Sequence, residues 1–235
     1  MSSSYERRTC PHSEENGGVA NSRGISHEVT SPCCNAMSSN SAMVPLWPEN
    51  MLGADWLALW SEMCQSSSTG CPTILTKSQW GGRAATCRTA MATPVTYVII
   101  HHTAGASCSS QSTCITQTKN VQSYHMDSNA WCDIGYSFLV GGDGSIFEGR
   151  GWTSVGAHAP NYNSNSIGIN LIGTFTSSNP TTAAQNAAKN LIACGVTRGY
   201  IKSAYILKGH RNVTATECPG NTFYNTVKTW PRFQA

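Results

Sequence analysis

Apolar residues along the chain fall into short runs and stripes that predict several strands. Residues 95–103 and 166–175 are apolar runs typical of strands buried inside a sheet. Residues 135–140 and 145–148 flank the turn sequence GGDG and predict a β-hairpin. Residues 204–209 form one further strand pattern.

Helical periods lie between these strands. Three helices are predicted, at residues 110–127, 183–194 and 222–230. The first carries Ile115, Val121 and Gln122 on one stripe, with Ser and Thr residues near its start for capping. The second should end at Gly195, and Pro231 should stop the third. Strands and helices interleave without strict alternation, which predicts an α/β fold with a mixed central β-sheet flanked by helices.

The predicted elements occupy only the later part of the chain. Residues 71–235 form the predicted domain, whereas residues 1–70 are a low-complexity segment that we expect to be disordered. Within that segment, residues 46–64 have the spacing of a short amphipathic helix, and residues 66–70 predict a flexible joint. The chain therefore reads as one domain with an N-terminal appendage.

Composition and charge narrow the class of protein. Apolar residues make up 40% of the chain and charged residues 11%, which argues against a solvated disordered chain or a coiled coil. No run of 18 apolar residues predicts a transmembrane helix. Residues 71–235 hold 12 basic and five acidic residues, a net charge of +7, whereas residues 1–70 carry −4. Such a positive domain favours an anionic partner, although ordinary surface lysines give the same balance.

The cysteines point to an oxidising compartment. Seven of the eleven fall in the predicted domain: Cys71, Cys87, Cys108, Cys114, Cys132, Cys194 and Cys218. An odd number suggests three disulfides and one thiol with another task, and so a secreted protein. Residues 1–18 lack the apolar stretch of a signal peptide. Export would then need a later start at Met37, Met43 or Met51, another first exon, or an unconventional route.

Histidine and cysteine near strand ends are the candidate chemistry. His101 and His102 end an apolar strand, where neighbouring side chains point to opposite faces. His210 follows another strand, and Cys218 lies eight residues later. Imidazole and thiolate are zinc ligands, and three of them with a water would make a catalytic site. The spacing matches no zinc finger and HExxH is absent, so hydrogen-bonded core histidines remain an alternative.

A series of motifs in the predicted domain resembles a known family. They are, in order, VIIHHTAG (98–105), QSYHM (122–126), CDIGYSFLVGGDGSIFEGRGW (132–152), GAH (156–158), SIGINLIGTF (166–175), LIACGV (191–196) and LKGHRNVTATECPG (207–220). The set strongly resembles the peptidoglycan recognition proteins, which are related to zinc amidases that cut the bacterial cell wall. The resemblance covers about residues 71–235 and implies the fold of that family.

The resemblance also implies a zinc site and a disulfide pattern. The zinc ligands would be His101, His210 and Cys218, with Tyr136 and Thr216 as the active-site residues. His102 would point away and be structural. The implied disulfides are Cys71–Cys194, Cys87–Cys132 and Cys108–Cys114, which would leave Cys218 as the zinc-binding thiolate. Cys10, Cys33, Cys34 and Cys64 have no implied partner.

The implied activity is hydrolysis of the amide between N-acetylmuramic acid and L-alanine, in innate immunity against bacteria. The partners would be peptidoglycan and its muropeptides rather than nucleic acid. Family positions that line the groove match Thr103, His125, Trp131, His158 and Asn163. Specificity positions match Ala130–Trp131 and Arg150, and an arginine favours stems with diaminopimelic acid over lysine.

Three alternatives to the amidase use the same residues. A receptor of the same family would bind the wall without cutting it, although such members have lost one or more zinc ligands. A cysteine hydrolase would use Cys218 as nucleophile and His210 as base. A structural zinc site in an interaction module would need a fourth protein ligand, and the sequence offers none.

Overall fold

The computed structural model describes residues 70–235. The disorder, the amphipathic helix and the joint predicted upstream lie outside the described residues. The same holds for the unassigned cysteines Cys10, Cys33, Cys34 and Cys64.

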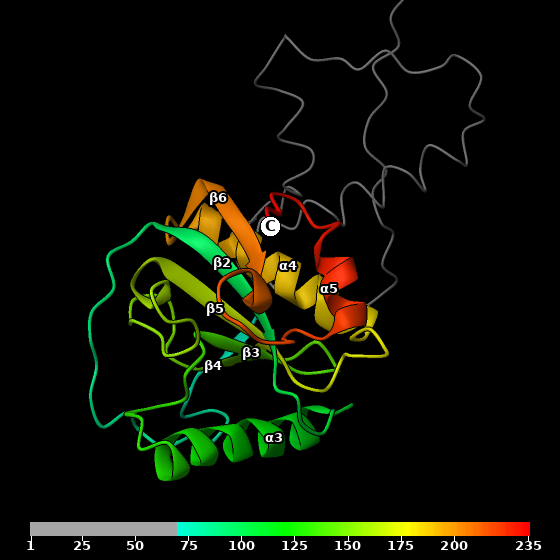
Figure 1. Cartoon of the computed structure of the whole chain (residues 1–235). Coiled ribbons are helices and arrows are strands. Elements are labelled where there is room, and N and C mark those ends of the chain that lie inside the picture. Colours follow the sequence, from blue (N-terminus) through cyan, green and yellow to red (C-terminus); the bar gives the residue numbers. More distant parts are fainter. Residues whose placement is uncertain (1–69) are drawn as a thin grey trace, which may run out of the picture. The chain divides into compact units, whose positions relative to one another are not determined.

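One mixed sheet organises the described domain, with strand order β1-β4-β3-β5-β2-β6 (Figure 1). The strands are β1 (Ile74–Leu75), β2 (Val95–His102), β3 (Phe138–Val140), β4 (Ile146–Glu148), β5 (Ser166–Leu171) and β6 (Ile201–Gly209). All neighbours pair in parallel except β3 and β4, which form the predicted antiparallel hairpin. The long strands β2 and β5 are central and buried, as their apolar runs predict.

Helices cover both faces of the sheet (Figure 1). They are α3 (Gln111–Ser123), α4 (Thr182–Thr197) and α5 (Asn221–Val227). Phe138 and Val140 of β3 pack with Leu191 in the core under α4 and α5. Leu139, which points the other way, packs with Cys114 under α3. The predicted α/β fold with a mixed, helix-flanked sheet is therefore confirmed. No helix within residues 70–235 combines the length and apolarity needed to span a bilayer.

The first helix begins and ends close to its predicted bounds. Ser110 caps it and shares a capping box with Thr113, and the helix continues into a π-helical turn, η1 (Tyr124–Ser128). Its most buried stripe is Cys114, Thr118 and Gln122, and is therefore largely polar. The side-chain amide of Gln122 accepts from the backbone N–H of Arg83, donates to the carbonyl of Arg83, and also donates to Asp133. The predicted apolar residues of the stripe lie at its edges and are only half-buried.

The prediction that the second helix ends at Gly195 is wrong. The helix runs to Thr197, and Gly195 is needed inside it because a Cβ there would lie 2.5 Å from Ile201 and 2.7 Å from the ring of Trp152. The chain leaves the helix at Gly199, whose φ of +72° suits glycine. A glycine required for close packing and a glycine required for a turn look alike in sequence.

One predicted strand is too long, and one strand was not predicted. β5 ends at Leu171 rather than at residue 175, and Gly173 follows with a φ of +145°. The strand that was not predicted is β1, which is only two residues long and pairs in parallel with β4.

The three implied disulfides are present. Cys71–Cys194 fastens the start of the domain to α4, and Cys87–Cys132 fastens the following segment to the loop after η1. Cys108–Cys114 closes a loop at the start of α3. Cys218 is the one free cysteine among residues 70–235.

Loss of the long-range disulfide should destabilise the domain most. The Cys71–Cys194 bridge spans 123 residues and Cys108–Cys114 spans six. In the chain-entropy description, these loops correspond to about 5 and about 2 kcal/mol of unfolding free energy. We expect paired Cys→Ser variants to differ in that order in denaturant titrations. Equal losses of unfolding free energy would show that these disulfides do not stabilise the domain by reducing the entropy of the unfolded chain.

Candidate metal centre

The register of two neighbouring strands brings the candidate ligands together. β2 and β6 pair in parallel with Ile100 opposite Gly209, so the next residues, His101 and His210, emerge side by side at one sheet edge. His210 opens the short helix η3 (His210–Asn212). The ring centroids of the two histidines are 4.3 Å apart.

Cys218 reaches the same point from the loop before α5. The backbone N–H of His102 donates to its Sγ at 3.3 Å, and Nδ1 of His101 lies 3.9 Å from that sulfur. Thr216 Oγ1 accepts a hydrogen bond from the backbone N–H of Cys218 at 3.2 Å. The ligand atoms of His101, His210 and Cys218 all lie within 4.8 Å of one another.

The three residues fit a zinc ion. Nε2 of His210 is buried without a hydrogen-bond partner, an orphaned state that a cation would relieve. Two imidazoles and one thiolate are ligands that zinc prefers, and three protein ligands leave its fourth position open. Burial lowers the pKa of His101 and brings that of His210 to about 4, so both rings are neutral and able to ligate.

The chemistry of Cys218 argues against a nucleophilic thiol. Burial raises its pKa to about 12, partly offset by the N–H of His102 and the charge of Arg211. Cysteine nucleophiles need the opposite shift, because the thiolate is the reactive species. The thiol would ionise on binding a cation, which supplies the positive charge that the buried site lacks.

Aromatic rings continue from the ligands into a groove. Tyr136 lies 5.2 Å from His101 and 5.5 Å from His125, and His125 lies 4.8 Å from Trp131, between ring centroids. Burial raises the pKa of Tyr136, so its phenol keeps its proton and can donate. Burial also lowers the pKa of His125 to about 4, which keeps that ring neutral.

A cavity of about 310 Å³ opens beside these rings. Its lining includes Thr103, His125 and Tyr136, together with Tyr124 of η1. Tyr124 is 61% exposed and Trp131 38%, and they are the only large hydrophobic side chains exposed in residues 70–235. Exposed aromatic rings at a cavity mark a surface for binding.

The remaining predicted groove residues have partners within the protein. Asn163 Oδ1 accepts from the backbone N–H groups of His158 and Ala159, and so holds that loop. His158 is buried, and its Nδ1 lies 3.0 Å from Nε2 of His101. His102 faces the opposite side of the sheet from His101, where its Nδ1 accepts from the N–H of Phe175.

Comparisons with known proteins identify the family of this chain. Residues 91–221 match the family described as N-acetylmuramoyl-L-alanine amidase. Peptidoglycan-recognition protein SC2 of Drosophila simulans is 54% identical over 163 residues, which cover 69% of this chain and 89% of that protein. The chain belongs to the peptidoglycan recognition protein family, with its type 2 amidase domain.

Two solved structures of the family carry muropeptides. A tyrosine-to-phenylalanine mutant of Drosophila PGRP-LB in complex with tracheal cytotoxin has a TM-score of 0.68 and 45% identity, covering 69% of this chain and 96% of that one. Human PGRP-IβC in complex with glycosamyl muramyl pentapeptide has a TM-score of 0.68 and 43% identity, covering 70% and 100%.

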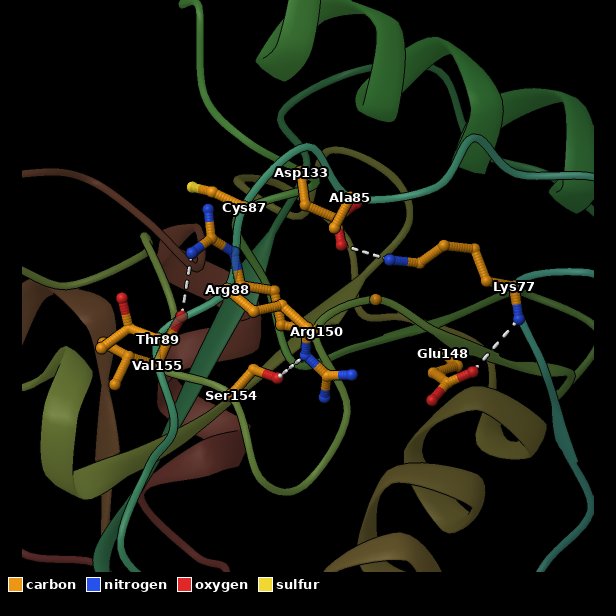
Figure 2. Close-up of a pocket in the computed structure, with 11 residues that line it drawn as sticks. Lys77, Ala85, Cys87, Arg88, Thr89, Asp133, Glu148, Arg150, Ser154 and Val155 are labelled. Atoms are coloured by element: carbon orange, nitrogen blue, oxygen red, sulfur yellow. Dashed lines mark hydrogen bonds and ion pairs between the residues drawn. The ribbon is translucent and has the colours of Figure 1, made fainter.

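In this protein, Arg150 does not line the groove cavity. It lines a second cavity of about 300 Å³, together with Arg88, Asp133 and Glu148 (Figure 2). Nε and one terminal nitrogen of its guanidinium each donate at 2.9 Å, to the carbonyls of Ile134 and Val155. Three of its five N–H donors remain for a ligand.

Two residues near the site were missed by sequence reasoning. Tyr124 precedes His125 in the QSYHM motif, and that adjacency was its only signal. Asn170 pairs in register with His101 and is fully buried, yet its amide nitrogen and oxygen have no hydrogen-bond partner. Nothing in an apolar strand sequence distinguishes such an amide from a satisfied one. A buried amide without protein partners calls for water or a ligand group.

Cys218 should resist alkylation in the folded, metal-free protein. It is buried and its pKa is raised to about 12, so at about pH 8 the reactive thiolate is scarce and covered. We expect peptide mapping after iodoacetamide treatment to show Cys218 unmodified until denaturant is added. Rapid native labelling would instead favour the cysteine hydrolase.

Proposed function

We propose that this protein is a zinc-dependent N-acetylmuramoyl-L-alanine amidase that cuts bacterial peptidoglycan as part of innate immunity. The observation that carries the proposal is the convergence of His101, His210 and Cys218, with an unpartnered nitrogen on His210. Family membership supports the substrate class, since relatives have been solved with tracheal cytotoxin and a muramyl pentapeptide. The complete ligand set favours hydrolysis over binding alone.

His101, His210 and Cys218 would hold a zinc ion, which would supply a Lewis acid and a bound water with a pKa of about 7. The chain's own contribution starts with Tyr136, whose protonated phenol lies beside the ligand His101. It can donate a hydrogen bond to the scissile carbonyl oxygen as negative charge develops there. Thr216 is exposed and accepts a hydrogen bond from the backbone N–H of Cys218. It would therefore orient the ligand loop and contact substrate or water.

The groove supports a substrate with sugar and peptide parts. Thr103 and His125 line its cavity, while Tyr124 and Trp131 offer exposed aromatic faces for packing. His158 and Asn163, which the resemblance assigns to the groove, are held by contacts inside the protein. The domain's net charge of +7 attracts an anionic polymer. The three disulfides fit a protein that acts outside the cell, where it would encounter bacterial cell wall.

Metal removal is the first test of this function. Mass spectrometry of digested muropeptides should show free stem peptides beginning with L-alanine, and chelation should stop their release until zinc is restored. Cys218→Ser should lose most zinc and all turnover, because a hydroxyl is a poor replacement for a thiolate ligand.

If the zinc-loaded wild type binds muropeptide but releases no stem peptide, the protein is a receptor instead. Release that survives chelation would point to a metal-independent hydrolase. Near-UV circular dichroism of Cys218→Ser checks that its loss of turnover is not a loss of fold.

Removal of the Tyr136 hydroxyl should slow turnover without disturbing the site. Tyr136→Phe keeps the ring packing against His101 and His125, so zinc content and stability should stay unchanged. Loss of one donor to a developing oxyanion costs about 10²–10³ in kcat. Steady-state kinetics measure this, and an unchanged kcat would exclude Tyr136 from the reaction.

Arg150 would give the expected preference for diaminopimelic stems: it lines a separate cavity, but its charge reaches His125 of the groove, where it adds to the effect of burial in lowering the pKa of that ring. A diaminopimelic residue carries a side-chain carboxylate where lysine has none, and a guanidinium can bind it through two parallel hydrogen bonds. The three free donors of Arg150 permit that contact while two others hold the carbonyls of Ile134 and Val155. A lysine stem would instead meet a like charge.

We therefore expect kcat/KM to favour diaminopimelic over lysine muropeptides by about tenfold or more. Arg150→Ala should abolish the preference. Arg150→Lys keeps the positive charge but loses the two parallel donors of the guanidinium, and should retain little of the preference. A preference that persists in both variants would show that Arg150 only supports its loop.

A further inference from the structure

The two ring nitrogens of His101 have different partners. Nδ1 faces Sγ of Cys218 at 3.9 Å and so belongs to the ligand cluster. Nε2 lies 3.0 Å from Nδ1 of His158, in a fully enclosed contact. A neutral imidazole that ligates through one nitrogen carries its proton on the other. His101 would therefore donate from Nε2, and His158 would accept at Nδ1.

The next contacts are consistent with a proton on Nε2 of His158. With Nδ1 accepting, its proton is on Nε2, which lies 3.5 Å from Oγ of Ser166. That hydroxyl already donates to the carbonyl of Tyr162 at 2.8 Å, so its lone pairs face the histidine. The chain His101–His158–Ser166–Tyr162 thus runs in one direction and ends on a backbone acceptor.

The ring of His158 is closely packed and has little room to change its orientation. A Cβ on Gly168 would lie 2.6 Å from its ring atoms, and a Cβ on Gly156 would lie 2.4 Å from them. Its backbone N–H donates to Oδ1 of Asn163 at 2.9 Å. Two glycines and one amide therefore hold the imidazole where it meets His101.

The same contacts leave little of His158 for a substrate. The residue is 7% exposed, and both ring nitrogens have protein partners. Its sequence motif predicts a groove residue, whereas its surroundings are those of a group that orients a metal ligand. Such partners of ligating histidines fix the tautomer and raise ligand basicity.

We propose that His158, backed by Ser166, is a positioning residue that holds His101 in the tautomer and orientation needed to bind zinc. This inference rests on the proposed zinc site. It assigns to His158 a role in metal affinity rather than in substrate contact.

The test compares zinc dissociation constants, measured by competition with a chelating dye, for two variants of similar shape. His158→Leu removes the acceptor and should weaken zinc binding about 10–100-fold. His158→Asn keeps an oxygen at the position of Nδ1 and should recover most of the affinity. Ser166→Ala removes only the far end of the chain and should cause a smaller loss in the same direction.

His125→Leu is the matched control, since His125 is also a buried neutral ring but contacts Tyr136 rather than the nitrogens of His101. Its zinc affinity should stay at the wild-type value. Near-UV circular dichroism of the metal-free proteins checks folding, and Ser166→Ala decides the matter if the His158 variants fail to fold. Wild-type affinity in both His158→Leu and Ser166→Ala, or equal losses in Leu and Asn, would overturn the inference. Wild type that binds no zinc would instead overturn the proposed function and the inference with it.

Discussion

The parallel pairing of β2 with β6 is the constraint on which the site depends. Because Ile100 lies opposite Gly209, the residues that follow, His101 and His210, leave their strands at the same edge. A slip of one residue would turn His101 to the α5 side, where His102 now packs beside Phe175. The core residues of both strands, Val98 and Ile100 in β2 and Leu207 in β6, resist such a slip, since it would expose them. The hydrophobic core therefore sets the geometry of the ligands.

Burial then sets their chemistry. In the absence of a cation, the enclosed site keeps its imidazoles neutral and its thiol protonated, and it leaves Nε2 of His210 without a partner. Unsatisfied buried polar groups destabilise a fold. A divalent ion would satisfy them together, because it would displace the thiol proton and accept a lone pair from one nitrogen of each histidine. The same desolvation keeps the phenol of Tyr136 protonated beside the ligands, as a donor must be.

Sequence reasoning predicted most of the fold because apolar runs and turn residues are local signals. It failed at Gly195, whose role depends on Trp152, more than 40 residues away, and at β1, which is ordered only by its partner strand. For the site, residue types and spacing alone left a metal and a core histidine both open, since strand register cannot be read from spacing. The ordered motifs of the family pointed to the ligands. They could not show that His158 faces His101, because that contact joins a loop to a distant strand.

The central claim is that two histidines and one cysteine of this chain hold a zinc ion with an open position. X-ray absorption at the zinc edge of the metal-loaded protein tests it most directly. The account predicts one sulfur at about 2.3 Å, two nitrogens at about 2.0–2.1 Å and one further light atom. A shell without sulfur would contradict the assignment of Cys218, and a shell of four protein ligands would contradict an open catalytic position.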